Sequence, residues 1–483
     1  MAEDIVSALR AVLPADAVLG AAEERKPYEC DGLTALRQVP LAVALPRSEE
    51  EVQAVLLTCR RLAVPVVARG SGTGLSGGAT PHPQGVLLSL ARMNRILEID
   101  PRARTARLEP GVTNLRISEA AAPYALHYAP DPSSQVACSI GGNVAENSGG
   151  AHCLKYGLTV HNVLGIRGYG IDGERIELGG TALDSPGLDL LAVAIGSEGL
   201  LLVVTEVIVR LIPRPPCAQL VMASFADVHR AGDAVAAVIA AGILPAALEM
   251  MDRKATRAVE PFVRAGYDLT AAAILLVEAD GTAEEVAEQV EEIERVLRAQ
   301  GASALHVSVS EAERARLWSG RKNAFPAAGR LSPDYYCMDG TIPRKHIGRV
   351  LEAIERMEAR HELSCMNVFH AGDGNLHPVI LFDANVPGSW ERAERFGAEI
   401  LETCVALGGT ITGEHGVGLE KINSMCVQFS PAERAAFFAV KAAFDPAQLL
   451  NPGKLIPTLA RCAEYGRMRV HGGALPHPEL PRF

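Results

Sequence analysis

Two histidines lie seven residues apart in a short stretch of sequence that predicts a β-hairpin. His370 and His377 flank Asp373-Gly374, a dipeptide that favours a two-residue hairpin turn, and apolar residues lie on both outer sides. With this dipeptide in the turn, His370 pairs with His377, and their Cβ atoms lie about 5 Å apart on one face. Such a pair can ligate one metal ion, although the spacing alone favours two polar residues with ordinary hydrogen-bond partners.

A carboxylate and a third imidazole adjoin each other at Glu414 and His415, directly after the strand-like segment Thr410-Ile411-Thr412. Two histidines and one carboxylate suit zinc or another divalent first-row metal with an open coordination position. A metal in such a site lowers the pKa of a bound hydroxyl group. His415 would then accept the proton as general base, because the ordinary pKa of imidazole is near neutral.

Arg321 is a candidate for binding a substrate carboxylate, because its guanidinium group can bind both carboxylate oxygens. Most arginines are solvated residues on helix surfaces, but Trp318 and Phe325-Pro326 surround this one in the sequence. The dipeptide Tyr335-Tyr336 could also bind substrate, although tyrosines beside an apolar segment more often pack in a core.

A glycine-rich loop, residues 68–79, follows a strand-like run and must be positioned by it. Glycine permits positive φ and lets a ligand approach bare main chain, and successive N–H groups in such a turn bind anions. The loop contains a G-x-G-x-x-G pattern from Gly72, but Pro81 and Pro83 exclude the helix that a Rossmann site requires. Residues 85–90 predict another strand. The loop therefore predicts a cradle for a nucleotide pyrophosphate, with a plain surface turn as the alternative.

Two more glycine-rich segments follow, residues 130–150 and 194–199, and the second continues into a β-branched run that predicts a buried strand. The prolines of residues 213–216 suggest a domain boundary. Beyond it, helical stretches rich in Ala and Glu alternate with strands. This alternation predicts an α+β domain whose single sheet carries helices on one face.

The chain has 483 residues, which allows about three domains or two large ones. Its net charge of −11 and the lack of a long basic run argue against nucleic acid as a partner. No apolar stretch reaches the length of about 18 residues that suggests a membrane span, and the acidic N-terminus does not resemble a signal peptide. The ten cysteines form no C-x-x-C pair, which argues against an iron–sulfur centre. Electron transfer would therefore need an organic cofactor, with any one-electron relay in a partner.

Three runs, residues 321–326, 332–341 and 369–375, join the glycine-rich segments in a specific combination of motifs. With them the chain, from about residue 39 to residue 466, resembles flavoproteins that combine a vanillyl-alcohol-oxidase-type FAD-binding domain with a C-terminal FAD-linked oxidase domain. The closest resemblance is to the flavin subunits of bacterial glycolate oxidases, also called glycolate dehydrogenases.

The resemblance implies an α+β fold: a two-subdomain FAD-binding domain and a C-terminal α+β substrate (cap) domain. It divides the chain into an N-terminal helix and lead-in (1–38), the FAD-binding domain (39–217), a cap domain with the metal site (218–445), and a segment that returns to the FAD domain (446–483).

The same resemblance implies that the glycine-rich segments bind the pyrophosphate and isoalloxazine of FAD, and that Asn451 returns to the flavin. The first loop has no His or Cys for covalent attachment, so the FAD is expected to dissociate. The implied cofactor-binding residues are Arg69, Gly70, Ser71, Gly72, Thr73, Gly74, Leu75, Ser76, Gly77, Pro130, Ser134, Gly141, Gly142, Asn143, Ala145, Asn147, Gly150, Glu198, Gly199, Val204 and Asn451.

In related 2-hydroxyacid dehydrogenases, the positions matching His370, His377 and Glu414 bind a divalent metal. The implied reaction transfers a hydride from C2 of a small 2-hydroxy acid to flavin N5, converting glycolate to glyoxylate. Relatives that act on 2-hydroxyglutarate carry Lys and Asn where this chain has Cys337 and Val379. A second carboxylate would lack partners, which favours a monocarboxylate.

The family further implies partners, a second flavin subunit and an iron–sulfur subunit that pass electrons to quinone. The expected location is the cytoplasm, with association at the inner face of the cell membrane through those partners as a variant. Two alternatives stay open: a stand-alone D-lactate dehydrogenase and a non-catalytic flavin subunit that only relays electrons.

Overall fold

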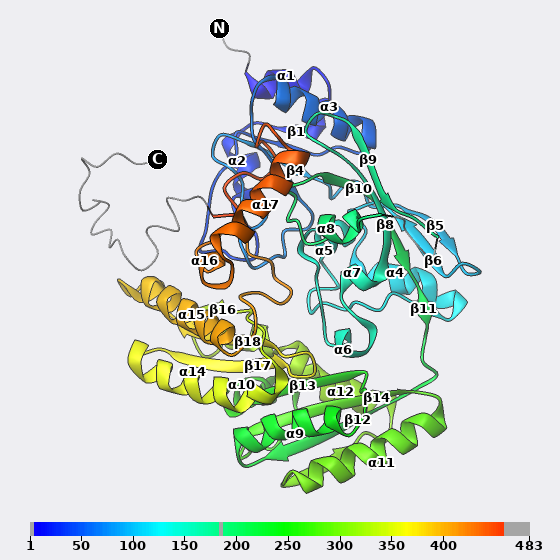
Figure 1. Ribbon diagram of the computed structural model, residues 1–483, viewed down its shortest axis with the longest axis vertical. Helices are drawn as coiled ribbons and strands as arrows, with labels where there is room; N and C mark the ends of the chain where they lie inside the picture. The colour runs from blue at the N-terminus through cyan, green and yellow to red at the C-terminus, as the bar shows by residue number, and fades with distance from the viewer. Residues whose placement is uncertain (1–3, 183–186, 458–483) are drawn as a thin grey trace.

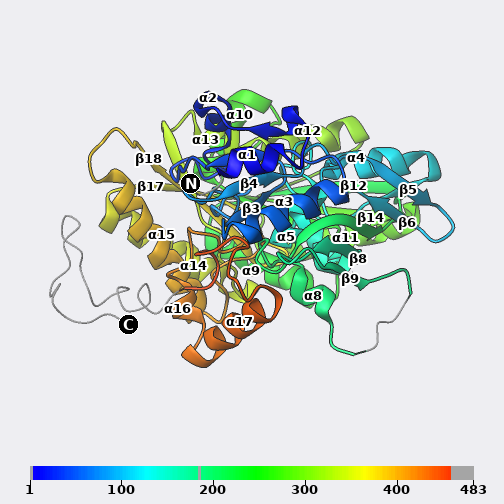
Figure 2. The same cartoon turned by 90° about the horizontal axis from the view of Figure 1, so that it is seen from above.

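The structure, a computed structural model, describes residues 4–182 and 187–457. Figure 1 shows an upper half built from the N-terminal part of the chain and a lower domain built around one large sheet. Figure 2 shows the same arrangement from above. Within the described ranges, no helix has both the length and the apolar character needed to cross a lipid bilayer.

A small sheet positions the first glycine-rich loop. Its strands lie in the order β1 (Val18–Leu19), β2 (Ala42–Ala44), β4 (Val86–Ser89) and β3 (Val66–Arg69). Helix α3 (Glu49–Arg61) joins β2 to β3 and begins where the Ser48 side chain accepts a hydrogen bond from the Glu51 N–H. The chain passes from β3 to the parallel strand β4 without a helix, so the Rossmann motif is correctly excluded.

A second, antiparallel sheet carries the other two glycine-rich segments. Its order is β5 (Ile96–Asp100), β6 (Thr105–Leu108), β10 (Val203–Arg210), β8 (Val163–Tyr169) and β9 (Arg175–Gly179). Helix α5 (Ile140–Glu146) packs Ile140 and Val144 into the core beneath this sheet. The other elements of this half are α1 (Ile5–Arg10), α2 (Ala22–Arg25), α4 (Asn114–Ala121), α6 (Cys153–Tyr156), α7 (Thr159–Asn162), α8 (Leu190–Ala194) and the ribbon of β7 (Leu126–His127) with β11 (Ile212–Pro213).

The lower domain has one antiparallel sheet, in which each strand pairs with its neighbours. The order is β15 (Ala304–Val307), β12 (Cys217–Phe225), β14 (Ala273–Gly281), β13 (Ala247–Asp252), β17 (Ser364–His370), β18 (Asn375–Phe382) and β16 (Asp334–Cys337).

Helices cover both faces of this sheet, so the expectation of helices on one face is wrong. One face packs against α9 (Val228–Ala240), α11 (Ala283–Ala299), α14 (Ile347–His361) and α15 (Ser389–Ala406), and the other against α10 (Arg253–Val263), α12 (Glu311–Lys322) and α13 (Ala324–Ala328). Figure 2 shows α10, α12 and α13 on the side away from α9 and α14. The reason is that the central strands are apolar at successive positions: every residue of β13 and β18 is buried.

The hairpin of β17 and β18 differs from the predicted register. His370 pairs with Asn375, and His377 pairs with Val368, so His370 and His377 are not direct partners. Residues 371–374 form a four-residue loop, in which the Gly374 N–H donates to the His370 carbonyl at 3.0 Å and Gly374 has φ +83°. Because side chains alternate along a strand, the two imidazoles still lie on one face as diagonal neighbours.

The last described residues return to the upper half. Leu450 forms a parallel bridge with Val66, and the Asn451 N–H donates to the Val66 carbonyl at 2.7 Å. Before them, α17 (Pro431–Phe444) lies against the upper half (Figure 1), where Lys441 donates to the Leu200 carbonyl, whereas α16 (Met425–Gln428) packs Met425 into the core of the lower domain. Residues 458–483 of the predicted returning segment lie outside the described residues, and the domain boundaries stay a prediction.

Candidate active site

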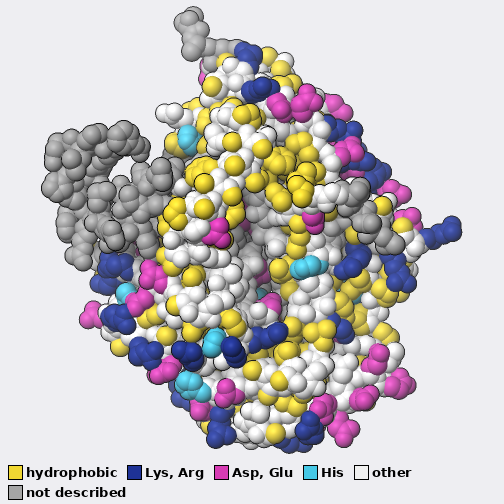
Figure 3. Space-filling model, viewed as in Figure 1, with side chains coloured by type: hydrophobic (Ala, Val, Ile, Leu, Met, Phe, Trp, Pro, Cys, Tyr) yellow, Lys and Arg dark blue, Asp and Glu magenta, His cyan; other side chains and the backbone are white. Residues whose placement is uncertain are grey.

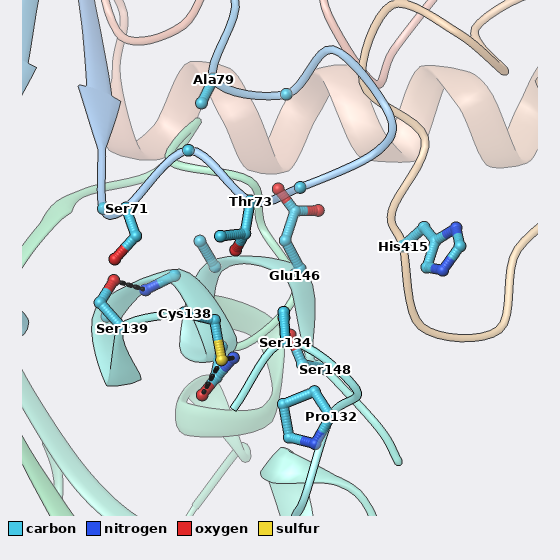
Figure 4. Close-up of a pocket in the computed structure, with 18 of the residues that line it drawn as sticks. Ser71, Thr73, Ala79, Pro132, Ser134, Cys138, Ser139, Glu146, Ser148 and His415 are labelled. Carbon is cyan, nitrogen blue, oxygen red and sulfur yellow. Dashed lines mark hydrogen bonds between the residues drawn. The ribbon is translucent and has the colours of Figure 1, made fainter. Parts of the chain in front are cut away.

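A cavity of about 380 Å³ lies between the upper half and the lower domain. All three glycine-rich segments line it, and the lower domain adds residues from α12, α13, β16, β18 and the Glu414-His415 dipeptide. Figure 4 shows the residues of its glycine-rich side, with His415 across the cavity from Thr73 and Glu146. Thr73 and His415 are about 340 residues apart in the sequence, yet both line this cavity.

Most of the predicted cofactor-binding residues lie on this wall. They are Arg69, Gly70, Ser71, Gly72, Thr73, Gly74, Leu75, Ser134, Gly141, Gly142, Asn143, Ala145, Glu198, Gly199 and Val204. Ser76, Gly77, Pro130, Asn147, Gly150 and Asn451 do not line it. Wall residues absent from the prediction include Cys138, Ser139, Glu146, Lys322 and Phe325.

Asn451 supports the cavity from behind. Its side-chain Nδ2 donates to the carbonyl oxygens of Gly78 at 3.0 Å and Glu198 at 2.7 Å. Gly78 belongs to the first glycine-rich loop, and Glu198 belongs to the third glycine-rich segment. Asn451 therefore fastens two walls together.

The cavity fits a ligand that needs close contact with main chain. A Cβ on Gly70 would collide with Ser139 Oγ, whereas a Cβ on Gly74 would meet no atom within 4 Å. Gly72 has φ +73°, a conformation that other residues rarely adopt. These features leave peptide groups exposed to the cavity, which suits the phosphates of a nucleotide cofactor.

The predicted metal ligands converge at the edge of this cavity. His377 Nε2 lies 3.0 Å and His370 Nε2 lies 3.4 Å from the same oxygen, Glu414 Oε1. The three donor atoms lie within 4.8 Å of one another, and all three side chains are largely buried. Burial favours the protonated acid, but the hydrogen bonds from both imidazoles hold the pKa of Glu414 well below its ordinary value. The donor set fits a divalent first-row cation.

His415 completes the cluster and lines the cavity. Its ring stacks on that of His377, with centroids 4.9 Å apart and an angle of 9° between the planes. Burial lowers the pKa of His415 to about 4, and its Nδ1 is buried without a hydrogen-bond partner among the described residues. A neutral imidazole with a free nitrogen can accept a proton.

Asp339 fixes the loop that carries these groups. Its Oδ2 accepts hydrogen bonds from the N–H of Gly413 at 3.0 Å and of His415 at 2.9 Å. Lys421 Nζ lies 3.4 Å from the same oxygen. Burial opposes ionisation of Asp339, but His415 and Lys421 lower its pKa to about 2.

Arg321 lies behind the predicted metal ligands. It is only 3% exposed, donates from Nε to Glu249 Oε2 at 2.6 Å, and has Nη2 3.3 Å from His370 Nδ1. Arg321 is not among the residues that line the cavity; its neighbour Lys322 is. The guanidinium edge predicted to bind a substrate is therefore partly occupied by protein groups.

The residues that bear on substrate size lie together. Cys337 pairs directly with Val379 across β16 and β18, and both are buried. Tyr335 lines the cavity, whereas Tyr336 is buried against Trp390 in the core.

Comparisons with known proteins agree with this arrangement. The family model described as FAD linked oxidases, C-terminal domain, matches residues 214–455, and the FAD binding domain model matches residues 40–179. The chain is 60% identical to Glycolate oxidase subunit GlcD of Escherichia coli, over 99% of this chain and 96% of that protein. It is 32% identical to D-lactate dehydrogenase of Archaeoglobus fulgidus, over 86% of this chain and 91% of that protein.

Among solved structures, p-cresol methylhydroxylase with substrate bound superposes with a TM-score of 0.80, covering 94% of this chain and 97% of that chain. The identity is 19%, so this likeness concerns the fold. It agrees with the predicted α+β class, an FAD domain of this type followed by a cap domain.

Proposed function

The chain belongs to the family of FAD-linked oxidases, and we propose that this member oxidises the 2-hydroxy acid glycolate to glyoxylate. One observation carries the proposal: His370, His377, Glu414 and His415 cluster at the edge of a glycine-lined cavity, in a chain 60% identical to a glycolate oxidase subunit. FAD held in that cavity supplies the hydride acceptor.

In this proposal His370, His377 and Glu414 hold a divalent metal, with zinc as one candidate. A metal in that position makes a substrate hydroxyl more acidic. His415 accepts the hydroxyl proton at its free Nδ1, and the hydrogen on C2 leaves as hydride, so the alcohol becomes a carbonyl.

Arg321 stays our candidate for balancing the charge of the substrate carboxylate, because its Nη2 lies beside His370. The buried pair Cys337 and Val379 supports a substrate with one carboxylate, since neither side chain can pair with a second.

The GlcD relatives are named as subunits of a glycolate oxidase, which supports the proposal that this chain assembles with partner subunits. We propose a second flavin subunit and an iron–sulfur subunit that carry electrons onward. We also propose a cytoplasmic location, with membrane association through those partners.

Anaerobic mixing of the purified protein with glycolate tests the proposal. Bleaching of the flavin absorption band by glycolate is the expected result. Bleaching by D-lactate alone would instead favour the second candidate, a D-lactate dehydrogenase, which the 32% identity to such an enzyme supports. No bleaching by either acid would favour an electron-relay subunit.

A further inference from the structure

A second cavity, of about 710 Å³, approaches the same cluster. Its walls come from the segment of α6 and α7 in the upper half, and from α9, the β17–β18 turn and residues 341–345 in the lower domain. The two cavities share one residue, Glu414. Of the proposed metal ligands, Glu414 therefore borders both cavities, whereas His377 lines only the first.

Glu414 presents a different oxygen to each environment. Its Oε1 contacts the two histidines, whereas its Oε2 lies 2.6 Å from the point that a Cβ on Gly149 would occupy. Gly149 lines the second cavity and not the first. The missing side chain at Gly149 thus leaves Glu414 accessible from the second cavity.

Asn375, on the wall of the second cavity, has a side-chain oxygen that lacks a hydrogen-bond donor among the described residues. This oxygen is Oδ1, and the residue is 5% exposed. Gly413 makes room for it, because a Cβ there would lie 2.6 Å from Asn375 Cγ. A buried amide oxygen without a partner is rare unless a ligand or water supplies the donor, and a hydroxy acid carries such a donor.

Two cationic residues, Arg344 and Lys345, also line the second cavity. Arg344 is held in place by donating from Nη1 to the Gly372 carbonyl at 2.7 Å, and the next residue, Lys345, is exposed. Figure 3 shows Lys and Arg side chains gathered along the upper edge of the lower domain, just below the junction with the upper half. Two carboxylates, Asp373 and Glu414, lie in the same wall as these two cations. In a chain with net charge −11, the exposed cation Lys345 would attract small anions to this wall.

We propose that the second cavity is the passage through which the 2-hydroxy acid anion reaches Glu414 and the 2-oxo acid leaves, with Asn375 as a contact on the way. The inference rests on the proposed function, because it needs a substrate that reacts at this cluster. It also gives the two cavities separate roles: the first holds the cofactor beside His415, and the second leads the anion towards them.

The test compares two tryptophan variants in stopped-flow reduction of the flavin by glycolate. Ala240 lines the second cavity, and Ala241, the next residue, does not; both are exposed. We expect Ala240→Trp to lower the second-order rate constant of reduction several-fold while the limiting rate at saturation stays unchanged. Ala241→Trp is the matched control and should behave as the wild type.

A second variant, which changes a charge, keeps the proposal testable if Ala240→Trp disturbs folding. Lys345→Glu is expected to lower the second-order rate constant by about tenfold at low salt, with the difference shrinking near 1 M salt, where charges are screened beyond about 3 Å. Equal rates for Ala240→Trp and Ala241→Trp, or a Lys345→Glu effect independent of salt, would overturn the passage. Failure of the proposed function looks different, because the wild type itself would not be reduced by glycolate at any concentration.

Discussion

Glu249 on β13 holds His370 on the neighbouring strand β17, with Glu249 Oε1 2.8 Å from His370 Nδ1. The other oxygen of the same carboxylate accepts a hydrogen bond from Arg321 Nε at 2.6 Å. A carboxylate at Nδ1 fixes the tautomer and orientation of an imidazole, so that Nε2 faces Glu414. One buried acid, 1% exposed, thus orients both a proposed metal ligand and the guanidinium group behind it.

Glu249→Gln should therefore weaken metal binding by about 10- to 100-fold, because the amide no longer supports the ligand charge. Competition with a chromogenic chelator measures the affinity directly. Glu278→Gln is a matched control, since Glu278 is 2% exposed on the same sheet but contacts Arg314 and Trp318 instead. Equal metal affinity in the Glu249 variant and the wild type would contradict this role.

His370→Ala should remove the bound metal and abolish reduction by glycolate, while the flavin spectrum stays that of the wild type. The reason is that His370 contacts Glu414 but does not line the glycine-rich cavity. Metal analysis and the visible spectrum of the same sample give both readouts. His361→Ala, at a partly buried histidine paired with Glu399, is the control that should keep both metal and flavin. Loss of flavin with the metal would mean that the histidine pair is structural.

Gly70→Ala should lower FAD retention, because the added Cβ collides with Ser139 Oγ and both residues line the cavity. The FAD content after gel filtration measures the effect. Gly180→Ala should retain FAD, since its Cβ would meet no atom within 4 Å and Gly180 does not line the cavity. Acid denaturation of the wild type should release all the flavin into solution; flavin left on the precipitated chain would indicate a covalent bond.

Glu278→Gln should destabilise the protein in a pH-dependent way. Glu278 joins the two halves of the molecule through His152, and although burial raises its pKa, His152 and Arg314 lower it to about 2. Its folded pKa lies below the unfolded value of about 4.3, so its stabilisation is complete above that pH and is lost as the pH falls towards 2.

Near neutral pH the substitution should cost about 1–3 kcal/mol, because it weakens the bonds of a buried acceptor for Trp318, while His152 and Arg314 keep Asp131 and Glu311 as partners. Urea unfolding at several pH values checks this, and the difference from the wild type should shrink below about pH 4. Glu292→Gln, at an exposed residue of α11, should cost little at any pH. A difference for Glu278→Gln that stays constant down to pH 3 would contradict the assignment.

Local sequence signals predicted much of this structure. The strand before the first glycine-rich loop and the alternation of elements after residue 213 both involve neighbours in sequence. The hairpin register was wrong because a two-residue turn was assumed, whereas residues 371–374 form a wider loop. Helix α5 was not predicted, since Gly141 and Gly142 disfavour helix and tertiary packing of Ile140 and Val144 decides the outcome.

The convergence of the proposed metal ligands was predicted from the sequence, whereas the residues that support them were not. His370, His377 and Glu414 could be singled out by residue type and by resemblance, and they converge as expected. Glu249 lies 121 residues from His370 in sequence, and no local pattern marks it. The burial of Arg321 behind the ligands likewise depends on how α12 packs on the sheet, which spacing along the chain cannot reveal.

The Asn451 side chain has a consequence for biosynthesis. A nascent chain that has not yet reached this residue already contains every glycine-rich segment, but it lacks the amide that ties Gly78 to Glu198. The strand β3 also lacks its neighbour Leu450 at that stage. Cofactor capture should therefore follow release of this late segment from the ribosome, so that loading with flavin reports on a fully translated and folded molecule.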